Sequence, residues 1–157
     1  MVKINIKTAP RQCKDGIITE YLSYSEGQES PTNYHKWVCY SIIAQALGRS
    51  VKTDFQHWDI FPNIYTILVG PSGYTHKSTA LNMGVKLLRR ACNDKLAFCD
   101  SKLTPAYLGH FLTNVYTDTG KAEGIAIGSE LSNLLGQTQL DDSLIKLLTD
   151  LYDCPEF

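Results

Sequence analysis

The amino-acid sequence predicts a protein of the α/β class, in which helices flank a parallel sheet. Two observations lead to this prediction. Short apolar runs typical of buried strands alternate along the chain with longer amphipathic segments typical of helices. The first of these runs, at 64–69, is followed by a glycine-rich break and then by a helical segment at 78–91. This order of strand, loop and helix is typical of a phosphate-binding loop.

The composition is that of an ordinary globular protein. The chain has 157 residues, which suits about one domain. Hydrophobic residues make up 43% and charged residues 20%, so disordered and fibrous classes are excluded. The formal net charge of −1 gives the whole chain no attraction to nucleic acid or to a membrane surface. We expect a cytoplasmic protein without a membrane partner, because neither a spanning run nor a signal peptide is visible.

The cysteines favour a reducing compartment. Their number is five, which is odd, and no two of them form a C-x-x-C pair. Disulfide frameworks and metal sites both prefer close pairs. We therefore expect buried free thiols rather than a metal centre.

The N-terminal part divides at about residue 30. Residues 1–30 read as a polar arm or linker, with one short strand at 1–6. Residues 31–157 read as the folded domain. Its first helix is expected to run to Leu47, with Ser30 as N-cap, Pro31 in the first turn and Gly48 as the stop. The apolar stripe of this helix is expected to contain Trp37, Tyr40, Ile42, Ile43, Ala46 and Leu47.

The run at 64–69 is rich in β-branched residues and almost continuously apolar. Such runs are typical of strands that are covered on both faces. The helix at 78–91 follows, and one side of it carries Leu81, Val85, Leu88 and Ala91.

The second half of the chain repeats the alternation of strand and helix. A strand is expected at 96–99, a helix from Thr104 and Pro105 to about Asn114, and another strand at 124–128. A last helix begins at 141–143 and turns four leucines to one side, Leu144, Leu147, Leu148 and Leu151. Units of this kind build a parallel sheet.

The loop itself predicts a phosphate site. Glycines let a turn curl so that its N–H groups face inward, and the N-terminus of the following helix adds partial positive charge. Lys77 would reach the phosphate oxygens, and the hydroxyl of Ser78 would bind Mg²⁺. Thr79 is the less favoured ligand because it faces elsewhere on the helix. The candidate nucleotide-binding residues are Gly70, Pro71, Ser72, Gly73, Tyr74, Thr75, His76, Lys77, Ser78 and Thr79.

The match to the standard motif G-x-x-x-x-G-K-S/T is imperfect. The stretch from Gly70 to Lys77 is one residue longer than the motif, and His76 stands where a glycine precedes the lysine. A non-glycine residue there must adopt the backbone conformation that the loop requires. The alternative is an ordinary glycine-rich turn between a strand and a helix.

Polar residues follow the other two predicted strands. Glu130 comes after the strand at 124–128 and could orient the attacking water, which makes it a candidate catalytic residue beside Lys77. Ser129 occupies the position of an Mg²⁺-binding aspartate, and its hydroxyl is a weaker ligand. The alternative for Glu130 is a carboxylate that stabilises a helix N-terminus. Asp100, after the second strand, either joins the site or caps a turn.

Four blocks of this sequence resemble a known family. The blocks are PTNYHKWVCYSIIAQALGR, FPNIYTILVGPSG with KSTALNMGVKLLR, EGIAIGSELSNLLG, and LIKLLTDLYDCPEF. In order and spacing they resemble the ATPase domain of phage and mobile-element primase–helicase-like proteins. That domain is similar to superfamily 3 helicases in the additional-strand P-loop NTPase class, which includes AAA+ and RecA-like folds. The resemblance covers residues 31–157 and implies ATP and Mg²⁺ as cofactors. It maps the Walker A lysine and hydroxyl onto Lys77 and Ser78, and the catalytic glutamate onto Glu130.

The resemblance also implies features beyond the end of this chain. In such domains a further strand, carrying a polar sensor residue, lies between the P-loop strand and the strand that ends at the catalytic glutamate. An arginine finger comes from a neighbouring subunit. We therefore expect an incomplete sheet, little ATP hydrolysis by this chain alone, and a homo-oligomeric ring that handles single-stranded DNA in the longer protein.

Two other functions stay open at this point. A small phosphotransferase would need arginines in a lid, and the only arginines after the loop are Arg89 and Arg90 on one helix. A degenerate or truncated P-loop domain could instead bind nucleotide or a partner without turnover. His76 and Ser129 favour this last alternative.

Overall fold

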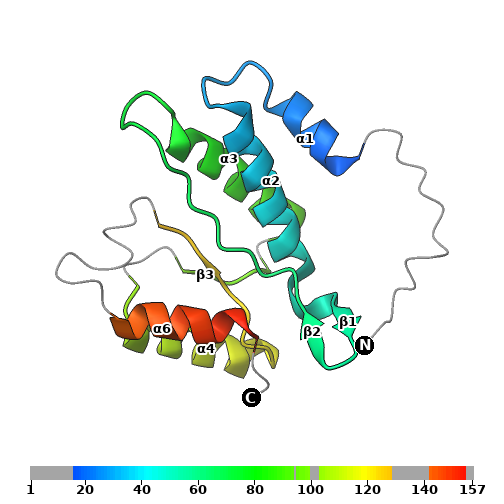
Figure 1. Cartoon of the computed structure of the whole chain (residues 1–157), viewed down its shortest axis with the longest axis vertical. Helices are drawn as coiled ribbons and strands as arrows, with labels where there is room; N and C mark the ends of the chain where they lie inside the picture. The colour runs from blue at the N-terminus through cyan, green and yellow to red at the C-terminus, as the bar shows by residue number, and fades with distance from the viewer. Residues whose placement is uncertain (1–15, 94, 100–102, 129–141, 155–157) are drawn as a thin grey trace. The chain divides into compact units, whose positions relative to one another are not determined.

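The computed structural model describes residues 16–93, 95–99, 103–128 and 142–154 (Figure 1). The chain divides into two compact units, Met1–Asn93 and Asp94–Phe157. Its described part is mixed α/β, with helices and two small two-stranded sheets. This agrees with the α/β class expected from the sequence.

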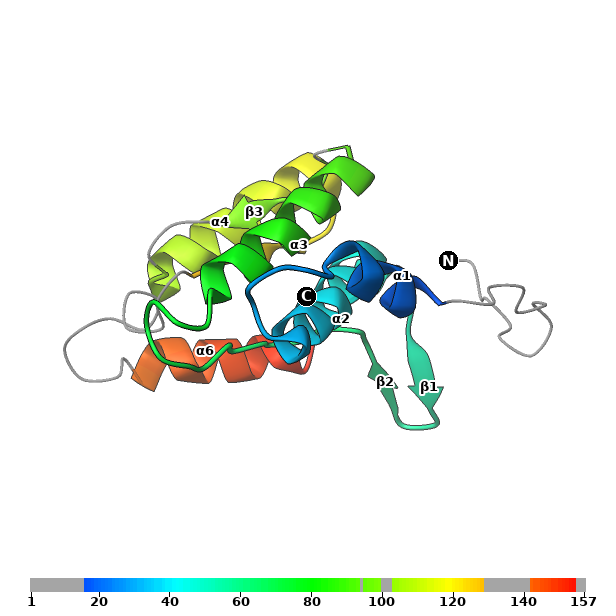
Figure 2. The ribbon, with the colours of Figure 1, turned by 90° about the horizontal axis from the view of Figure 1, so that it is seen from above.

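The first unit is built around helix α2 (Thr32–Leu47). Helices α1 (Ile17–Tyr24) and α3 (Lys77–Ala91) both pack against α2, and a short 3₁₀ turn, η1 (Gly48–Ser50), follows it (Figures 1 and 2). The buried residues of this core are Tyr21, Val38, Cys39 and Ala80. Gly84 lets α3 approach α2 closely, because a Cβ atom there would overlap the side chain of Val38.

Helix α1 lies inside the segment that was expected to be a polar arm. Tyr21 is 4% exposed, so at least this part of the segment belongs to the folded unit. A spacing signal was present, since Ile17, Ile18, Tyr21 and Leu22 recur at three- and four-residue steps. Without a side-chain cap at Gly16, the beginning of the helix carries no sequence signal. The strand expected at 1–6 lies outside the described residues.

Helix α2 has the expected length, but the predicted apolar stripe was only partly correct, since Ile42 and Ile43 pack against the core of the first unit and other members of the stripe are exposed. Its buried residues are His35, Val38, Cys39 and Ala44, whereas Trp37 is 52% exposed and Leu47 is 39% exposed. The N-cap assignment of Ser30 was also wrong, because the Ser30 hydroxyl donates to the carbonyl of His76 instead. The aromatic residues of α2 are spaced as a stripe, but the buried face is the one that meets α1 and α3.

An antiparallel hairpin, β1 (Thr53–Phe55) and β2 (Trp58–Ile60), follows η1. The register pairs Phe55 with Trp58 and Asp54 with Asp59, so alternation places the aromatic pair and the two carboxylates on opposite faces. The rings of Phe55 and Trp58 are stacked, 6.3 Å between centroids, and both are more than half exposed.

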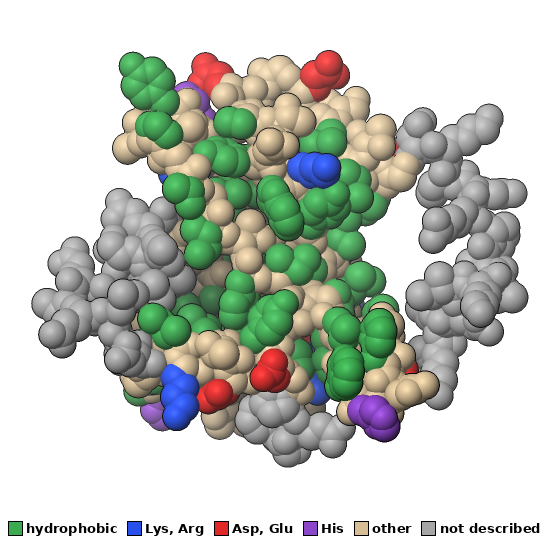
Figure 3. All heavy atoms as spheres, viewed as in Figure 1, with side chains coloured by type: hydrophobic (Ala, Val, Ile, Leu, Met, Phe, Trp, Pro, Cys, Tyr) green, Lys and Arg blue, Asp and Glu red, His purple; other side chains and the backbone are tan. Residues whose placement is uncertain are grey.

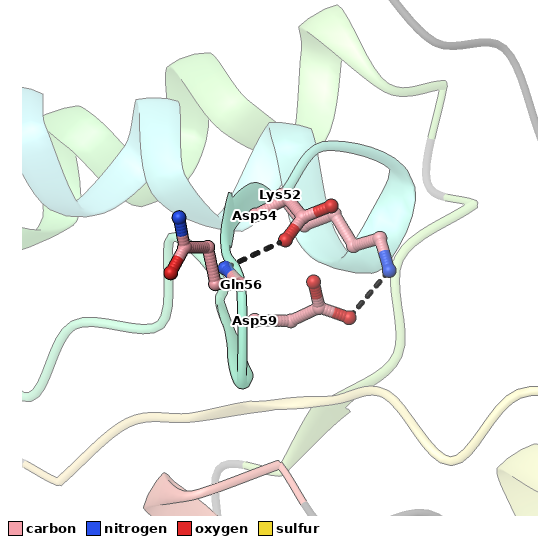
Figure 4. Close-up of polar contacts among 4 residues, drawn as sticks. All are labelled: Lys52, Asp54, Gln56 and Asp59. Atoms are coloured by element: carbon pink, nitrogen blue, oxygen red, sulfur yellow. Dashed lines mark hydrogen bonds and ion pairs between the residues drawn. The ribbon is translucent and has the colours of Figure 1, made fainter.

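The acidic face of the hairpin is tied by two contacts (Figure 4). Asp59 forms an ion pair with Lys52, and Asp54 accepts a 3.1 Å hydrogen bond from the backbone N–H of Gln56. Gln56 has a positive φ of 55°, which a glycine or asparagine usually supplies. Because the turn is Gln-His, no local pattern predicts this hairpin.

The segment 64–69 is extended, but the prediction of a strand covered on both faces was wrong. No strand is assigned to it, and its exposure alternates. Tyr65, Ile67 and Val69 are 55%, 62% and 78% exposed, whereas Leu68 packs against the core of the first unit. The hydroxyls of Thr66 and Ser41 lie 2.6 Å apart, and this hydrogen bond holds the less exposed face of the segment against α2.

The second unit contains a βαβ arrangement. Strand β3 (Phe98–Cys99) pairs in parallel with β4 (Ile125–Ala126), and helix α4 (Pro105–Thr119) connects them. Helix α6 (Asp142–Tyr152) packs against α4. The buried residues of this core are Cys99, Leu103, Leu108 and Leu144. The parallel pairing and both helices were predicted from the sequence and are confirmed.

Helix α4 begins where the sequence predicted. The Thr104 hydroxyl accepts a 3.1 Å hydrogen bond from the N–H of Tyr107, and Pro105 occupies the first turn. The helix continues to Thr119 and ends at Gly120, whose φ is 72°, so the end expected near Asn114 was too early.

Two further expectations concern the whole chain. In the part that the structure describes, no helix has the length and apolar character needed to cross a membrane. Cys39 and Cys99 are buried, as expected, whereas Cys92 and Cys154 are only half-buried.

Candidate functional site

The glycine-rich loop connects the extended segment 64–69 to helix α3 within the first unit. The helix begins at Lys77, one residue before the predicted start. Two loop residues have left-handed backbone angles, Gly73 at φ 80° and His76 at φ 44° and ψ 38°. The loop therefore turns sharply where the sequence predicted a turn, and His76 adopts a conformation that glycine adopts more easily.

The side chain of Lys77 folds back over this loop. Its Nζ donates to the carbonyls of Gly70, at 2.6 Å, and Pro71, at 3.3 Å, and lies 3.4 Å from Oγ1 of Thr75. Thr75 in turn donates a 3.0 Å hydrogen bond to the carbonyl of Pro71. The loop thus closes around an ammonium group. A bound phosphate would take the place of these carbonyls as the partner of the ammonium group.

Most other loop residues point to solvent. Ser78 and Thr79 are exposed in the first turn of α3. Tyr74 is 86% exposed. The hydroxyl of Ser78 is therefore available to a hard cation next to the Lys77 ammonium.

Helix α2 and the residues before it support the loop at both ends. The Tyr34 hydroxyl donates a 2.5 Å hydrogen bond to the carbonyl of Val69, and Ser30 donates a 2.8 Å hydrogen bond to the carbonyl of His76. Nε2 of His76 lies 3.0 Å from a carboxylate oxygen of Glu29. Sequence reasoning missed these three supporting residues, and no local pattern signals them, since Tyr34 and Val69 are 35 positions apart.

The perturbed titratable groups lie in the core of the first unit. Burial lowers the pKa of His35, and burial raises the pKa of the Cys39 thiol. The pKa of Tyr21 rises to about 12, mainly through burial and further through Cys39 and Tyr24. The Tyr21 hydroxyl and both ring nitrogens of His35 have no hydrogen-bond partner among the described residues. These groups are therefore held neutral in the core.

The remaining candidates fall outside the described residues. These are Ser129 and Glu130, together with Asp100. The structure thus brings together the loop residues 70–79, but it gives no position for the candidate catalytic glutamate. Within the described ranges, no group of three or more His, Cys, Asp or Glu side chains could hold a metal ion.

Comparison with known proteins adds no relative. No protein-family model, no curated protein and no solved structure matches this chain.

Proposed function

We propose that loop residues 70–79 bind the phosphate chain of ATP together with Mg²⁺. In this proposal the chain is the ATP-binding and ATP-hydrolysing module of a helicase-like replication protein of a phage or mobile element. Its fold is the N-terminal part of a P-loop NTPase domain.

The position of Lys77 is the observation that carries the proposal. Its Nζ lies 2.6 Å from the carbonyl oxygen of Gly70, the first residue of the loop, although the two residues are seven positions apart along the chain. An ammonium group held inside a glycine-containing loop, at the N-terminus of a 15-residue helix, is a strong attractor of anions. The backbone carbonyls that hold it are neutral, whereas phosphate oxygens would offer a charge-assisted contact.

The residues assigned to the site suit a nucleotide that is bound together with Mg²⁺. The exposed Ser78 hydroxyl suits Mg²⁺, which prefers hard oxygen ligands. The ion, when bound, neutralises charge on the phosphate oxygens. Lys77 orients the phosphate chain, Glu130 orients the attacking water, and Ser129 supplies a second, weaker ligand to the ion. The roles of Glu130 and Ser129 rest on their positions after the strand predicted at 124–128 and, for Glu130, also on the resemblance.

The helicase part of the proposal also rests on the resemblance. It implies that the longer protein forms a homo-oligomeric ring and acts on single-stranded DNA. Because the net charge of this chain is −1, DNA contacts would come from local patches or from the rest of the ring.

A pair of lysine variants tests the nucleotide site. Lys77→Ala should weaken the binding of Mg²⁺–ATP by at least about tenfold, since one charge-assisted contact contributes about 1.5–3 kcal/mol. Lys86→Ala is the matched control, because Lys86 is exposed on the same helix and outside the loop. Calorimetric titration measures both. Equal affinity in the wild type and Lys77→Ala would contradict the proposal.

A turnover assay separates the two candidate functions. ATP hydrolysis is measured for this chain, and for a longer protein that contains it, with and without single-stranded DNA. Stimulation by DNA in the longer protein is the expected result for a helicase-type ATPase. Tight binding without turnover in either protein would favour the alternative, a P-loop domain that binds nucleotide or a partner only.

A further inference from the structure

The two ends of the loop are held by one short stretch of chain. Tyr34 binds the carbonyl of Val69, immediately before the loop, and Ser30 binds the carbonyl of His76, immediately before Lys77. Tyr34 lies in the first turn of α2, and Ser30 lies two residues before the helix begins, so both ends of the loop are attached to one five-residue stretch of chain. The spacing between the ends therefore depends on two side-chain hydroxyls.

The Ser30 contact acts on the most strained residue of the loop. His76 is left-handed, a conformation that a residue with a Cβ atom rarely adopts without support. It is fixed at both its carbonyl, by Ser30, and its imidazole, by Glu29. Ser30 is 6% exposed, so its hydrogen bond is shielded from water. Because His76 precedes Lys77, the backbone angles of His76 set the direction in which the Lys77 side chain leaves the beginning of α3.

The Tyr34 contact fixes the other end. Its hydroxyl lies so close to Gly70 that a Cβ atom there would overlap it. Gly70 is also the residue whose carbonyl holds the Lys77 ammonium. Helix α2 thus positions Gly70, which holds the Lys77 ammonium group, and the segment just before α2 positions His76, which precedes Lys77.

We infer that Ser30 and Tyr34 are positioning residues that hold the loop in the shape that binds the phosphate chain of a nucleoside triphosphate. The inference rests on the proposed function and adds two residues to it. Neither hydroxyl needs to touch the nucleotide. Each acts through the loop, by keeping Lys77 and the backbone of the loop in place before the ligand arrives.

Matched single variants provide the test in the full chain. Ser30→Ala and Tyr34→Phe each remove one hydroxyl, and their controls are Ser23→Ala on α1 and Tyr40→Phe on α2. Affinity for Mg²⁺–ATP is measured by calorimetric titration, and amide hydrogen exchange is measured over residues 70–77. Each test variant should bind about three- to tenfold more weakly than the wild type, and its loop amides should exchange faster. The controls should match the wild type in both.

A double variant separates positioning from a merely structural role. Glycine adopts left-handed angles without strain, so His76→Gly removes the need for Ser30 to hold that conformation. Ser30→Ala should therefore reduce affinity less in the His76→Gly background than in the wild type, which is a non-additive result. The same loss in both backgrounds would overturn the role of Ser30.

The remaining outcomes distinguish this inference from the function on which it rests. If the wild type binds Mg²⁺–ATP, and Ser30→Ala and Tyr34→Phe bind as tightly with unchanged loop exchange, only the inference is overturned. If the wild type binds no nucleotide, the proposed function is overturned, and the inference with it.

Discussion

The hydroxyl of Tyr34 lies 2.5 Å from the backbone carbonyl of Val69, so helix α2 holds the residue that precedes the glycine-rich loop. The next residue, Gly70, passes directly beside the same hydroxyl. A tyrosine on a helix and a glycine in a loop are thus packed against each other where the proposed phosphate site begins.

Because of this contact, we expect the single methyl group added at position 70 to lower the stability of the first unit. In Gly70→Ala the new Cβ atom would overlap the Tyr34 hydroxyl and lie 2.9 Å from Oγ1 of Thr75. We expect a destabilisation of about 1–3 kcal/mol and weaker nucleotide binding, because the loop must move to make room. Urea unfolding followed by tryptophan fluorescence measures the stability, since both tryptophans, Trp37 and Trp58, belong to the first unit.

Gly109→Ala is the control for this variant. A Cβ atom at Gly109 meets nothing within 4 Å, and the residue lies inside helix α4. This substitution should leave the tryptophan-monitored unfolding of the first unit unchanged, and amide hydrogen exchange of α4 should show a gain of roughly 0.5–1 kcal/mol, because alanine favours a helix over glycine. A neutral result for Gly70→Ala would show that the loop does not pack against Tyr34.

The alternating exposure of the segment 64–69 predicts opposite results for neighbouring residues. Leu68 packs against the core, so Leu68→Ala should destabilise the first unit by about 2 kcal/mol. Ile67 is 62% exposed, and Ile67→Ala should change stability by no more than about 0.5 kcal/mol. Both are measured by the same unfolding experiment. Equal losses would mean that both faces of the segment are covered, as the sequence first suggested.

Buried His35 predicts a loss of stability in acid. Burial lowers the pKa of His35 in the folded protein below the ordinary value of 6.5. As the pH falls, His35 is therefore protonated in the unfolded chain before it is protonated in the folded protein. Stability contributed by neutral His35 is therefore complete above pH 6.5 and falls below it. Stability should therefore fall between pH 7.5 and pH 5.5, by at most about 1.4 kcal/mol, which is the limit for one proton that only the unfolded chain binds. His35→Leu should lose this part of the pH dependence, as measured by urea unfolding at both pH values.

Exposed His57 offers the matched comparison for this effect. His57→Gln should keep the acid sensitivity of the wild type, because that side chain is exposed at the turn of the hairpin. If His35→Leu and the wild type lose the same stability between pH 7.5 and 5.5, other groups govern the acid response.

The hairpin predicts a gain in stability on removing a charge. Asp54 and Asp59 are cross-strand partners, and like charges in such pairs repel. Asp54→Asn removes the charge and keeps the Oδ1 acceptor for the Gln56 N–H, so it should stabilise the hairpin by about 0.2–1 kcal/mol at low salt, and the gain should shrink as salt is added. Asp59→Asn should give a smaller gain, because it also removes the ion pair with Lys52. The amide exchange of residues 53–60 measures both, and equal gains would argue against the ion pair.

Local signals in the sequence were sufficient for several elements. Thr104 and Pro105 placed the beginning of α4, because a capping hydroxyl and a proline act within one helical turn. The leucines of 142–152 placed α6, and the two short apolar runs placed the parallel pair β3 and β4. The loop at 70–76 was located by its glycines and by the lysine that follows.

Other elements depend on contacts that no local pattern carries. The stripe predicted for α2 included Trp37 and Leu47, which are exposed, because the face that α1 and α3 cover carries His35, Val38 and Cys39. The segment 64–69 looks equally apolar on both sides, and only its packing decides that Leu68 is covered and Ile67 is not.

The candidate site shows the same division. The sequence by itself determined where the anion-attracting residues stand, since Gly70, Lys77 and Ser78 lie within nine positions of one another. The tertiary structure decided what holds them, because Tyr34 is 35 positions from Val69 and Ser30 is 46 positions from His76. Residues so far apart meet only after the helices have packed, so a short-range pattern specifies the chemistry of the loop and long-range packing specifies its shape.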